Sequence, residues 1–226
     1  MYHVVSMTKN NAFLTTISIV IILAFLFIVY AASNKSSSSS QVIRTELQKV
    51  LSTDHVKWGA KQKNVLVEFS DYQCPACGSF HQVLKAYEAS GSAQYKIASK
   101  IAFVYKNYPL EKIHKNARSA AYAAEAAGMQ DKFFEMGDLL FENQKVWEGS
   151  NDTAKVFGEY AASLKLDLTK FKKDMTSPEV KNRVDEDMIL GNQVGIDSTP
   201  TFYLNGKKLE FSTLDEFNKL LAEGVK

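Results

Sequence analysis

The stretch Asn64–Cys77, NVLVEFSDYQCPAC, predicts a buried strand that runs into a helix carrying two cysteines. Residues 65–67 and 69 form a short apolar run, as expected for a strand covered on both faces. Cys74 and Cys77 are three residues apart, so they share one face of a helix and can close a disulfide across its first turn. Pro75 suits an early helical position, where its missing N–H would have no partner within the helix.

The position of Cys74 predicts that it is the attacking thiolate. The thiolate, not the thiol, carries out disulfide exchange, and free N–H groups and the helix dipole stabilise negative charge at a helix N-terminus. We therefore expect a lowered pKa for Cys74, while Cys77 resolves the mixed disulfide. Glu68 interrupts the apolar strand six residues before Cys74. It is either a carboxylate beneath the pair that relays the proton of the resolving thiol, or a solvent-facing strand residue.

A CxxC pair can also bind metal or form a purely structural disulfide. A CxxC pair can supply half of a zinc site, but structural zinc usually takes four ligands and the chain has two cysteines. His81 is close by, yet four paired ligands are not visible in the sequence. A purely structural disulfide would constrain the unfolded chain little, because the loop that it closes is short. The pattern favours a redox pair that needs no metal and no organic cofactor.

The stretch VLVEFSDYQCPAC resembles the active-site strand and helix of the DsbA-like branch of thioredoxin-fold oxidoreductases. In that superfamily a buried acid stands six residues before the first cysteine, and Glu68 occupies this position here. A second stretch, Gly195–Phe202 (GIDSTPTF), resembles the segment that carries the family's cis-proline loop. The two motifs follow in the order that the family requires, and together they are more specific than CxxC alone.

The resemblance implies an α/β, thioredoxin-like fold over residues 54–226, with a helical insertion at about residues 113–192. It also implies that the Thr199–Pro200 bond is cis and that this loop lies beside the cysteines; a plain trans turn proline is the alternative. We place Pro200 with Glu68 and the cysteines in the catalytic site. The backbone of Thr199 should pair with an extended substrate peptide, and Pro75 and Ala76 should also contact the substrate.

The region before this domain predicts a membrane anchor. Residues 12–32 contain no charged residue, and about twenty apolar residues cross a bilayer as a helix. A tail of residues 1–11 precedes this helix, and residues 33–53 follow as a serine-rich linker with a short helix or a packed lead-in at its end. A cleaved signal peptide is the alternative, although its apolar region usually has only about 7–15 residues. Met7 would also serve as a start of the chain.

Apolar spacing predicts the elements within the domain. The helix after Cys77 should continue to Tyr87 and end near Gly91, and residues 100–105 should form the next strand. A capping box predicts a last helix from Thr213, with a buried face made of Leu214, Phe217, Leu220 and Leu221. We interpret His55 as structural or solvent-exposed and His114 as structural, because no sequence feature connects either with the cysteines.

Composition and resemblance together predict an exported oxidase. The net charge of +2 does not suggest a nucleic-acid partner. A resting Cys74–Cys77 disulfide would pass to cysteine-containing exported proteins, and the resemblance implies reoxidation by a membrane partner of the DsbB or vitamin-K-epoxide-reductase type. We expect a single-pass protein with its domain on the extracytoplasmic side, since disulfides form in oxidising compartments. Basic residues after the apolar run point weakly the other way.

Two further functions are compatible with the same sequence. One is a disulfide reductase or isomerase fed by a membrane electron donor, and the other is a non-catalytic, peptide-binding chaperone. The best-known DsbA-like protein has histidine beside the second cysteine, where this chain has Ala76. Alanine brings neither charge nor donor to the Cys74 thiolate. We therefore predict a less extreme thiolate pKa and a weaker oxidant than DsbA.

Overall fold

The computed structural model of the protein describes residues 21–30, 45–59, 61–88 and 91–225. Residues 1–42 and 43–226 are separate units. Residues 21–30 are helical. None of the helices in the described ranges is both long and apolar enough to cross a membrane. The other residues of the predicted anchor, and residues 33–44 of the predicted linker, lie outside those ranges.

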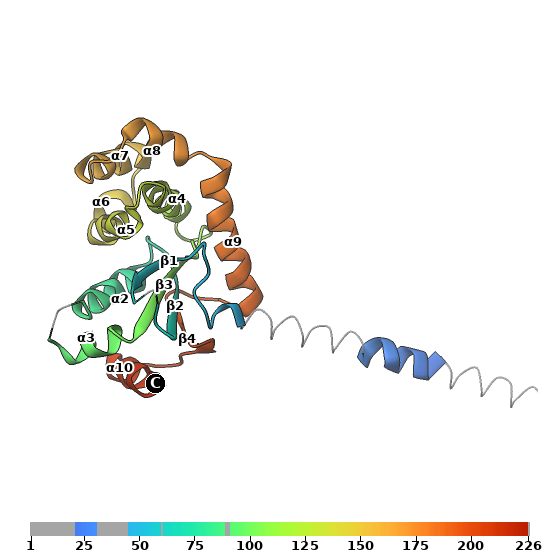
Figure 1. Cartoon of the computed structure of the whole chain (residues 1–226). Coiled ribbons are helices and arrows are strands. Elements are labelled where there is room, and N and C mark those ends of the chain that lie inside the picture. The colour runs from blue at the N-terminus through green and yellow to red at the C-terminus, as the bar shows by residue number, and fades with distance from the viewer. Residues whose placement is uncertain (1–20, 31–44, 60, 89–90, 226) are drawn as a thin grey trace, which may run out of the picture. The chain divides into compact units, whose positions relative to one another are not determined.

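A five-stranded mixed sheet forms the centre of residues 43–226 (Figure 1). The strands lie in the order β1 (His55–Trp58), β3 (Ile101–Asn107), β2 (Asn64–Ser70), β4 (Thr201–Leu204) and β5 (Lys207–Lys208). β2 and β3 run parallel, and the other neighbouring strands run antiparallel. Every residue of β2 and β3 is buried, as the apolar run predicted for a strand covered on both faces.

The two faces of β2 contribute to different cores. On one face, Leu66 packs with α2 (Pro75–Ala86), α3 (Ala93–Ala98) and α10 (Leu214–Gly224). On the other face, Val65 and Phe69 pack with α9 (Pro178–Val194) and with Leu47. Because side chains alternate along a strand, Glu68 lies on the same face as Leu66, towards α2.

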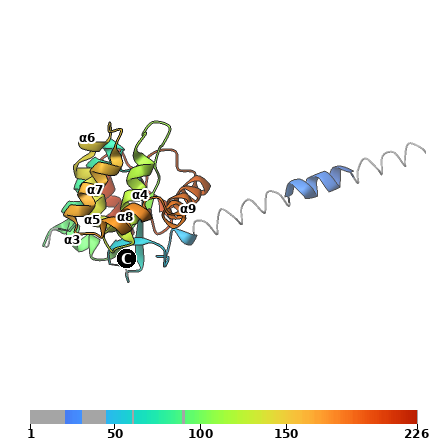
Figure 2. The ribbon, with the colours of Figure 1, turned by 90° about the horizontal axis from the view of Figure 1, so that it is seen from above.

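The predicted helical insertion lies between β3 and β4. It consists of α4 (Ala117–Gly128), α5 (Phe133–Glu142), α6 (Gln144–Trp147), α7 (Thr153–Ser163), α8 (Leu168–Asp174) and α9. In Figure 1, α4 to α8 gather above the sheet while α9 runs down beside it, and Figure 2 shows the same group from above. Buried alanines of α4 pack with aromatic residues of α5, α7 and α8. This alanine and aromatic core extends to both cysteines and joins the insertion to the domain.

Two predictions about helices were wrong. Helix α2 ends at Ala86, with Tyr87 as its C-cap, before Gly91. Tyr87 is buried with 1% of its surface exposed, as its place on the apolar face predicts. A further helix, α3, follows, which the apolar spacing does not predict. Leu214 of α10 is 42% exposed, whereas Phe217 and Leu221 are buried. Leu214 follows the N-cap Thr213 directly, so it lies on the first turn, and this turn extends beyond the core that the rest of the helix covers.

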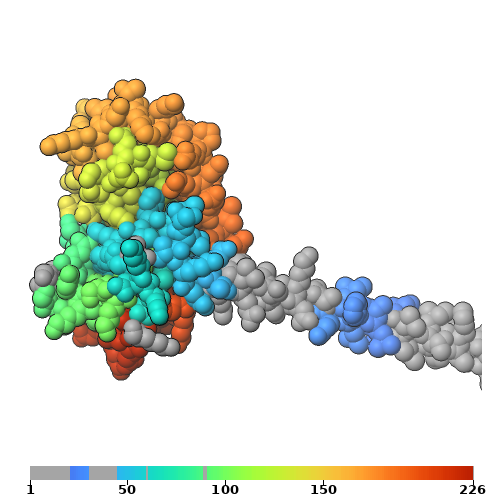
Figure 3. All heavy atoms as spheres, viewed as in Figure 1, coloured from blue at the N-terminus to red at the C-terminus, as the bar shows by residue number. Residues whose placement is uncertain are grey.

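The lead-in before β1 is a packed segment with very little helix. Within residues 45–51, only residues 45–46 are helical. Leu47 is 1% exposed and joins the core of Val65 and Phe69. The light-blue residues of this region lie against the orange residues of α9 in Figure 3, and Leu51 and Leu190 border the same cavity. Leu47 thus packs on the domain, as one of the two interpretations expected, while residues 42–44 of the expected short helix lie outside the described ranges.

Candidate active site

The cysteines lie at the start of α2, just after β2 has ended. Cys74 is the N-cap residue and Pro75 is the first residue of the helix. Cys77 is fully buried and Cys74 is 7% exposed, while Pro75 and Ala76 between them are exposed. The two thiols are not joined in this structure. The more accessible sulfur therefore belongs to Cys74, the residue predicted to attack.

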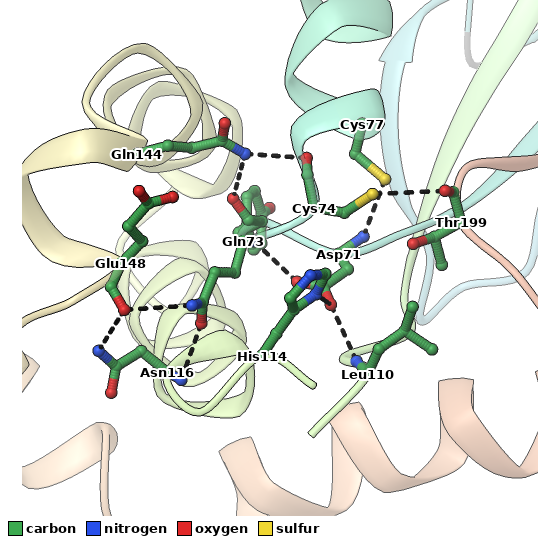
Figure 4. A network of polar contacts seen from close by, with 11 residues as sticks. Asp71, Gln73, Cys74, Cys77, Leu110, His114, Asn116, Gln144, Glu148 and Thr199 are labelled. Atoms are coloured by element: carbon green, nitrogen blue, oxygen red, sulfur yellow. Dashed lines mark hydrogen bonds and ion pairs between the residues drawn. The ribbon is translucent and has the colours of Figure 1, made fainter. Parts of the chain in front are cut away.

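The loop before β4 brings a distant part of the chain to the first cysteine. Helix α9 stops at Gly195, whose left-handed conformation (φ 78°) turns the chain. The Thr199–Pro200 bond is cis, as the resemblance implied. The sulfur of Cys74 lies 3.4 Å from the carbonyl oxygen of Thr199 (Figure 4). Cys74, Cys77 and the loop of Thr199 and Pro200 thus meet in one place.

The two thiols have pKa values that are shifted in opposite directions. The pKa of Cys74 is lowered to about 5, chiefly by hydrogen bonding from Cys77, with burial opposing and Thr199 and backbone N–H groups assisting. The pKa of Cys77 is raised well above its usual range, first by burial and then by Cys74 and the charge of Glu68. At neutral pH, Cys74 is therefore the thiolate and Cys77 the thiol.

Glu68 is buried on the α2 face of β2, with 3% of its surface exposed. Burial raises the pKa of its carboxyl to about 8, with Ser70 opposing the rise and Cys74 adding to it. The solvent-facing interpretation of this residue is therefore wrong, because the sheet is covered by α2 here. At neutral pH, Glu68 therefore holds a proton. Once it is ionised, its negative charge raises the pKa of Cys77.

A polar network that was missed in the sequence holds the turn before Cys74 (Figure 4). The Asp71 carboxylate accepts hydrogen bonds from the N–H groups of Gln73 at 2.7 Å and Leu110 at 2.9 Å. It also lies 2.7 Å from Nδ1 of His114. The Asp71 carbonyl accepts from the N–H of Cys74 at 3.0 Å, and the Asp71 N–H lies 3.5 Å from the Cys77 sulfur.

His114 is therefore structural, as interpreted, but it is also connected with the cysteines through Asp71, which no sequence feature indicated. Asp71 and His114 are 43 positions apart in the sequence. They meet only because the chain returns to this site after β3. The one available signal was an aspartate directly after the strand, because such residues favour turns that bond their own backbone.

Glutamine side chains tie the same turn to the insertion. The Gln144 amide on α6 donates to the carbonyls of Tyr72 at 2.7 Å and Cys74 at 3.0 Å. The Gln73 side chain accepts from the N–H of Asn116 and donates to the carbonyl of Glu148. Spacing in the sequence does not reveal these contacts. They hold Cys74 from the side of the insertion, so the insertion supports the site directly.

The other two histidines in the described ranges, His55 and His81, pack within the domain. His81 stacks on Phe141, with ring centroids 4.8 Å apart. His55 stacks on Phe133 at 3.5 Å and lies 2.8 Å from Glu125, so it is structural and not solvent-exposed. Within the described ranges, no three of the histidine, cysteine, aspartate and glutamate side chains are placed to hold a metal ion.

Comparison with known proteins gives one family and a consistent set of folds. Residues 52–223 match the thioredoxin family. The crystal structure of oxidised BdbD from Bacillus subtilis is similar with a TM-score of 0.66 and 25% identity, covering 79% of this chain and 96% of that one. α-DsbA1 of Wolbachia pipientis has a TM-score of 0.66 at 19% identity, covering 80% and 94%. The latter likeness concerns the fold alone.

Curated proteins that match carry a different name. The Na(+)/H(+) antiporter NhaA 1 of Mycobacterium sp. (strain KMS) is 34% identical over 157 residues, and that of Salinispora arenicola (strain CNS-205) is 33% identical over 155 residues. Each match covers 69% of this chain, but only 24% and 22% of those proteins. The chain thus spans about a quarter of the length of these relatives. The antiporter name describes those much longer proteins as a whole.

Proposed function

The chain belongs to the thioredoxin family and has the fold of DsbA-type proteins, and from this premise we propose that it is a thiol–disulfide oxidoreductase working as an oxidase. Its Cys74–Cys77 disulfide would pass to exported proteins that contain cysteines. The observation that carries the proposal is the opposed pKa shift of the two thiols, at a helix N-terminus beside the cis-proline loop.

The steps follow from this arrangement. A substrate thiolate attacks the sulfur of Cys74, the Cys74–Cys77 bond breaks, and Cys77 leaves with the electron pair. Cys77 then takes a proton from the Glu68 carboxyl, which holds one at neutral pH because its pKa is about 8. A second substrate thiolate attacks the substrate sulfur bound to Cys74 and releases Cys74 as a thiolate. The substrate loses two electrons, and the cysteine pair gains them.

The lowered pKa of Cys74 favours the oxidising direction. A stabilised thiolate stabilises the reduced protein, which makes the disulfide a better oxidant. A pKa of about 5 for Cys74 lies between about 3.5 for DsbA and about 7 for thioredoxin. We therefore expect a reduction potential between the values of those two proteins, about −120 and about −270 mV. This agrees with the weaker oxidant predicted from Ala76.

The surroundings of Cys74 suit an extended peptide. Pro75 and Ala76 are exposed next to it, and the carbonyl of Thr199 lies on its other side. A substrate chain would pair with the backbone of Thr199 as an added strand. Pro200 places no N–H in that pairing.

A membrane anchor with the domain on the extracytoplasmic side completes the proposal. Support comes from the uncharged run of residues 12–32 and from exposed apolar side chains in the described helix, such as Phe25 at 63% and Phe27 at 69%. Apolar patches of this kind mark interaction with a partner or a membrane. A membrane-bound, quinone-linked partner of the DsbB or vitamin-K-epoxide-reductase type would restore the disulfide.

The reduction potential of the full chain in glutathione buffers tests the proposal. A value between about −120 and −180 mV supports an oxidase, whereas a value near −270 mV would mean that the pair reduces disulfides. Failure to form a Cys74–Cys77 disulfide in any buffer would exclude the exchange reaction itself. As matched variants, Cys77→Ser should trap a substrate peptide on Cys74, and Cys74→Ser should trap none.

A further inference from the structure

A groove lies on the helical insertion, where α4, α7 and α8 meet the start of α9 (Figure 1). Helix α4 contacts each of the other three helices. The groove has a volume of about 740 Å³, which lies within the range of roughly 300–1,000 Å³ typical of small-molecule sites. None of the residues that line it takes part in the contacts described above for the cysteines. The groove is therefore a candidate binding site outside the active site.

Part of the lining of this groove is apolar. Tyr122 of α4 and Met175 at the end of α8 are half-buried there and pack against the alanine and aromatic core of the insertion. Ala154 of α7 is exposed at the groove. Apolar contact removes surface from water on both partners. A ligand that brings apolar surface of its own would therefore bind here more tightly than a simple ion.

The rest of the lining is strongly basic. Three exposed lysines, one each from α7, α8 and α9, border the groove: Lys155, Lys172 and Lys181. None of the three forms an ion pair within the described part of the chain. Arg118 also lines the groove, but its guanidinium is already paired with Glu111 at 2.6 Å and with Asp185 at 2.5 Å. Among the described residues, no carboxylate lines the groove. Three positive charges are thus left for a ligand to neutralise.

A negative head group joined to an apolar body fits both parts of this lining. We propose that the groove binds an anionic phospholipid, with its phosphate at the three lysines and the first carbons of its chains against Tyr122 and Met175. The walls are helices, whose backbone groups bond within each helix, so the groove offers no strand edge to an extended acidic peptide. The membrane anchor proposed above would keep the domain close to lipid. The inference does not depend on the exchange reaction of the cysteines.

The test measures how fast individual lysines are acetylated in the full chain, held in bilayer nanodiscs of phosphatidylcholine with or without phosphatidylglycerol. Mass spectrometry gives a rate for each lysine. The three groove lysines should react at least about fivefold more slowly when phosphatidylglycerol is present, which corresponds to what one lysine contributes near an anionic lipid surface. Lys63 before β2 and Lys96 of α3 are also exposed and lie outside the groove. They serve as internal controls and should react at the same rate in both kinds of disc.

A matched pair of variants places or omits one negative charge in the groove. Ala154→Glu brings a carboxylate beside the lysines, and Ala154→Gln brings a side chain of the same size without the charge. Both should fold, because Ala154 is exposed in the first turn of α7, where an acidic residue also suits the helix dipole. Ala154→Glu should lose the protection by phosphatidylglycerol, and Ala154→Gln should keep most of it. Both variants should retain disulfide exchange, since Ala154 is remote from the contacts of the cysteines.

Three outcomes would overturn the lipid site. The groove lysines could be slowed no more than Lys63 and Lys96, which would mean that anionic lipid acts on the whole surface alike. Protection could persist in Ala154→Glu, which would mean that the lysines are shielded by something other than a ligand in the groove. A short polyglutamate peptide, added to discs of phosphatidylcholine alone, could protect the groove lysines as well as phosphatidylglycerol does, which would assign the groove to acidic peptides. Each of these results leaves the exchange reaction untouched, because that reaction is measured separately by the reduction potential.

Discussion

Two buried acids in this domain, Glu68 and Asp187, show what a partner does to a carboxyl group. Asp187 on α9 lies 2.8 Å from Nζ of Lys106 and accepts from the N–H of Asn107 at 2.9 Å. Glu68 on β2 has no ion pair among the described residues. Burial raises the pKa of both, to about 6 for Asp187 and about 8 for Glu68, and Lys106 holds back the rise only at Asp187.

This difference sets the charge of each group at neutral pH. Asp187 is ionised and closes a structural network, in which Lys106 also lies 2.9 Å from Asp54. Glu68 keeps its proton and is the member of the pair that can give it away. A buried carboxyl group with a neighbouring lysine, such as Asp187, thus forms a structural ion pair. A similarly buried carboxyl group without a cation, such as Glu68, keeps its proton and can donate it.

Removing the cation should produce the largest effect. Lys106→Met leaves Asp187 and Asp54 buried without their partner, and breaking a buried pair in this way costs about 3–5 kcal/mol of unfolding free energy. Urea unfolding at pH 7 measures the loss. The exchange rate of the folded protein should not change, because Lys106 contacts neither cysteine.

The matched control is Lys208→Met, which removes a 38% exposed lysine that pairs with the exposed Glu210. Surface pairs contribute only about 0–1 kcal/mol, so this variant should unfold almost as the unmodified chain does. If Lys106→Met also left the unfolding free energy almost unchanged, the ion pair between Lys106 and Asp187 would not stabilise the fold as described.

Glu68→Gln should act in the opposite way on stability. The folded pKa of Glu68 is raised from 4.5 to about 8, so its proton stabilises the fold fully below pH 4.5 and this contribution is lost as pH rises through 8. The variant should therefore match the unmodified chain near pH 4 and exceed it in unfolding free energy by up to roughly 5 kcal/mol above pH 8. Disulfide exchange should slow by about 10² because the proton donor is gone.

Unfolding curves at the two ends of this pH range provide the check. Asp187→Asn serves as the matched acid-to-amide change, and it should lower stability near neutral pH because Lys106 loses an ionised partner. Glu68→Gln behaving like Asp187→Asn would show that the two acids do not differ as described.

What the sequence predicted well was local. The cysteines, Pro75 and Glu68 lie within one strand and one turn of each other, so fixed spacing placed them correctly. The cis bond of Pro200 followed from family resemblance. Asp71 and His114 could not be paired in advance, because their contact depends on where the chain returns after β3. The same holds for Gln144 of the insertion, whose carbonyl partners Tyr72 and Cys74 lie 72 and 70 positions earlier in the chain.

The helical period also did not predict where α10 lies relative to the sheet and the other helices. The spacing of Leu214 matches that of Phe217 and Leu221, yet only the latter two are buried. The helical period identifies the face of α10 correctly, but it does not tell how far the first turn reaches past the sheet. In a similar way, the strand pattern did not tell whether Glu68 is buried or faces solvent. Glu68 is buried because helix α2 covers this face of the sheet.

The smallest effect should come from Ala76→His, which tests whether the residue beside Cys77 changes the pKa of the Cys74 thiol. Ala76 is exposed beside Cys74, so a histidine there adds a donor and a partial positive charge to the thiolate without disturbing the core. The pKa of Cys74 should fall below about 5, which stabilises the reduced form and makes the disulfide more oxidising. A tenfold change in the exchange equilibrium corresponds to a potential about 30 mV higher. Alkylation of Cys74 against pH, together with the potential in glutathione buffers, measures both shifts.

Ala76→Gln is the control without the charge and should move the potential less. An unchanged pKa in Ala76→His would mean that the helix N-terminus and the Cys77 thiol already account for the thiolate, and that the residue between the cysteines does not set the strength of this oxidant.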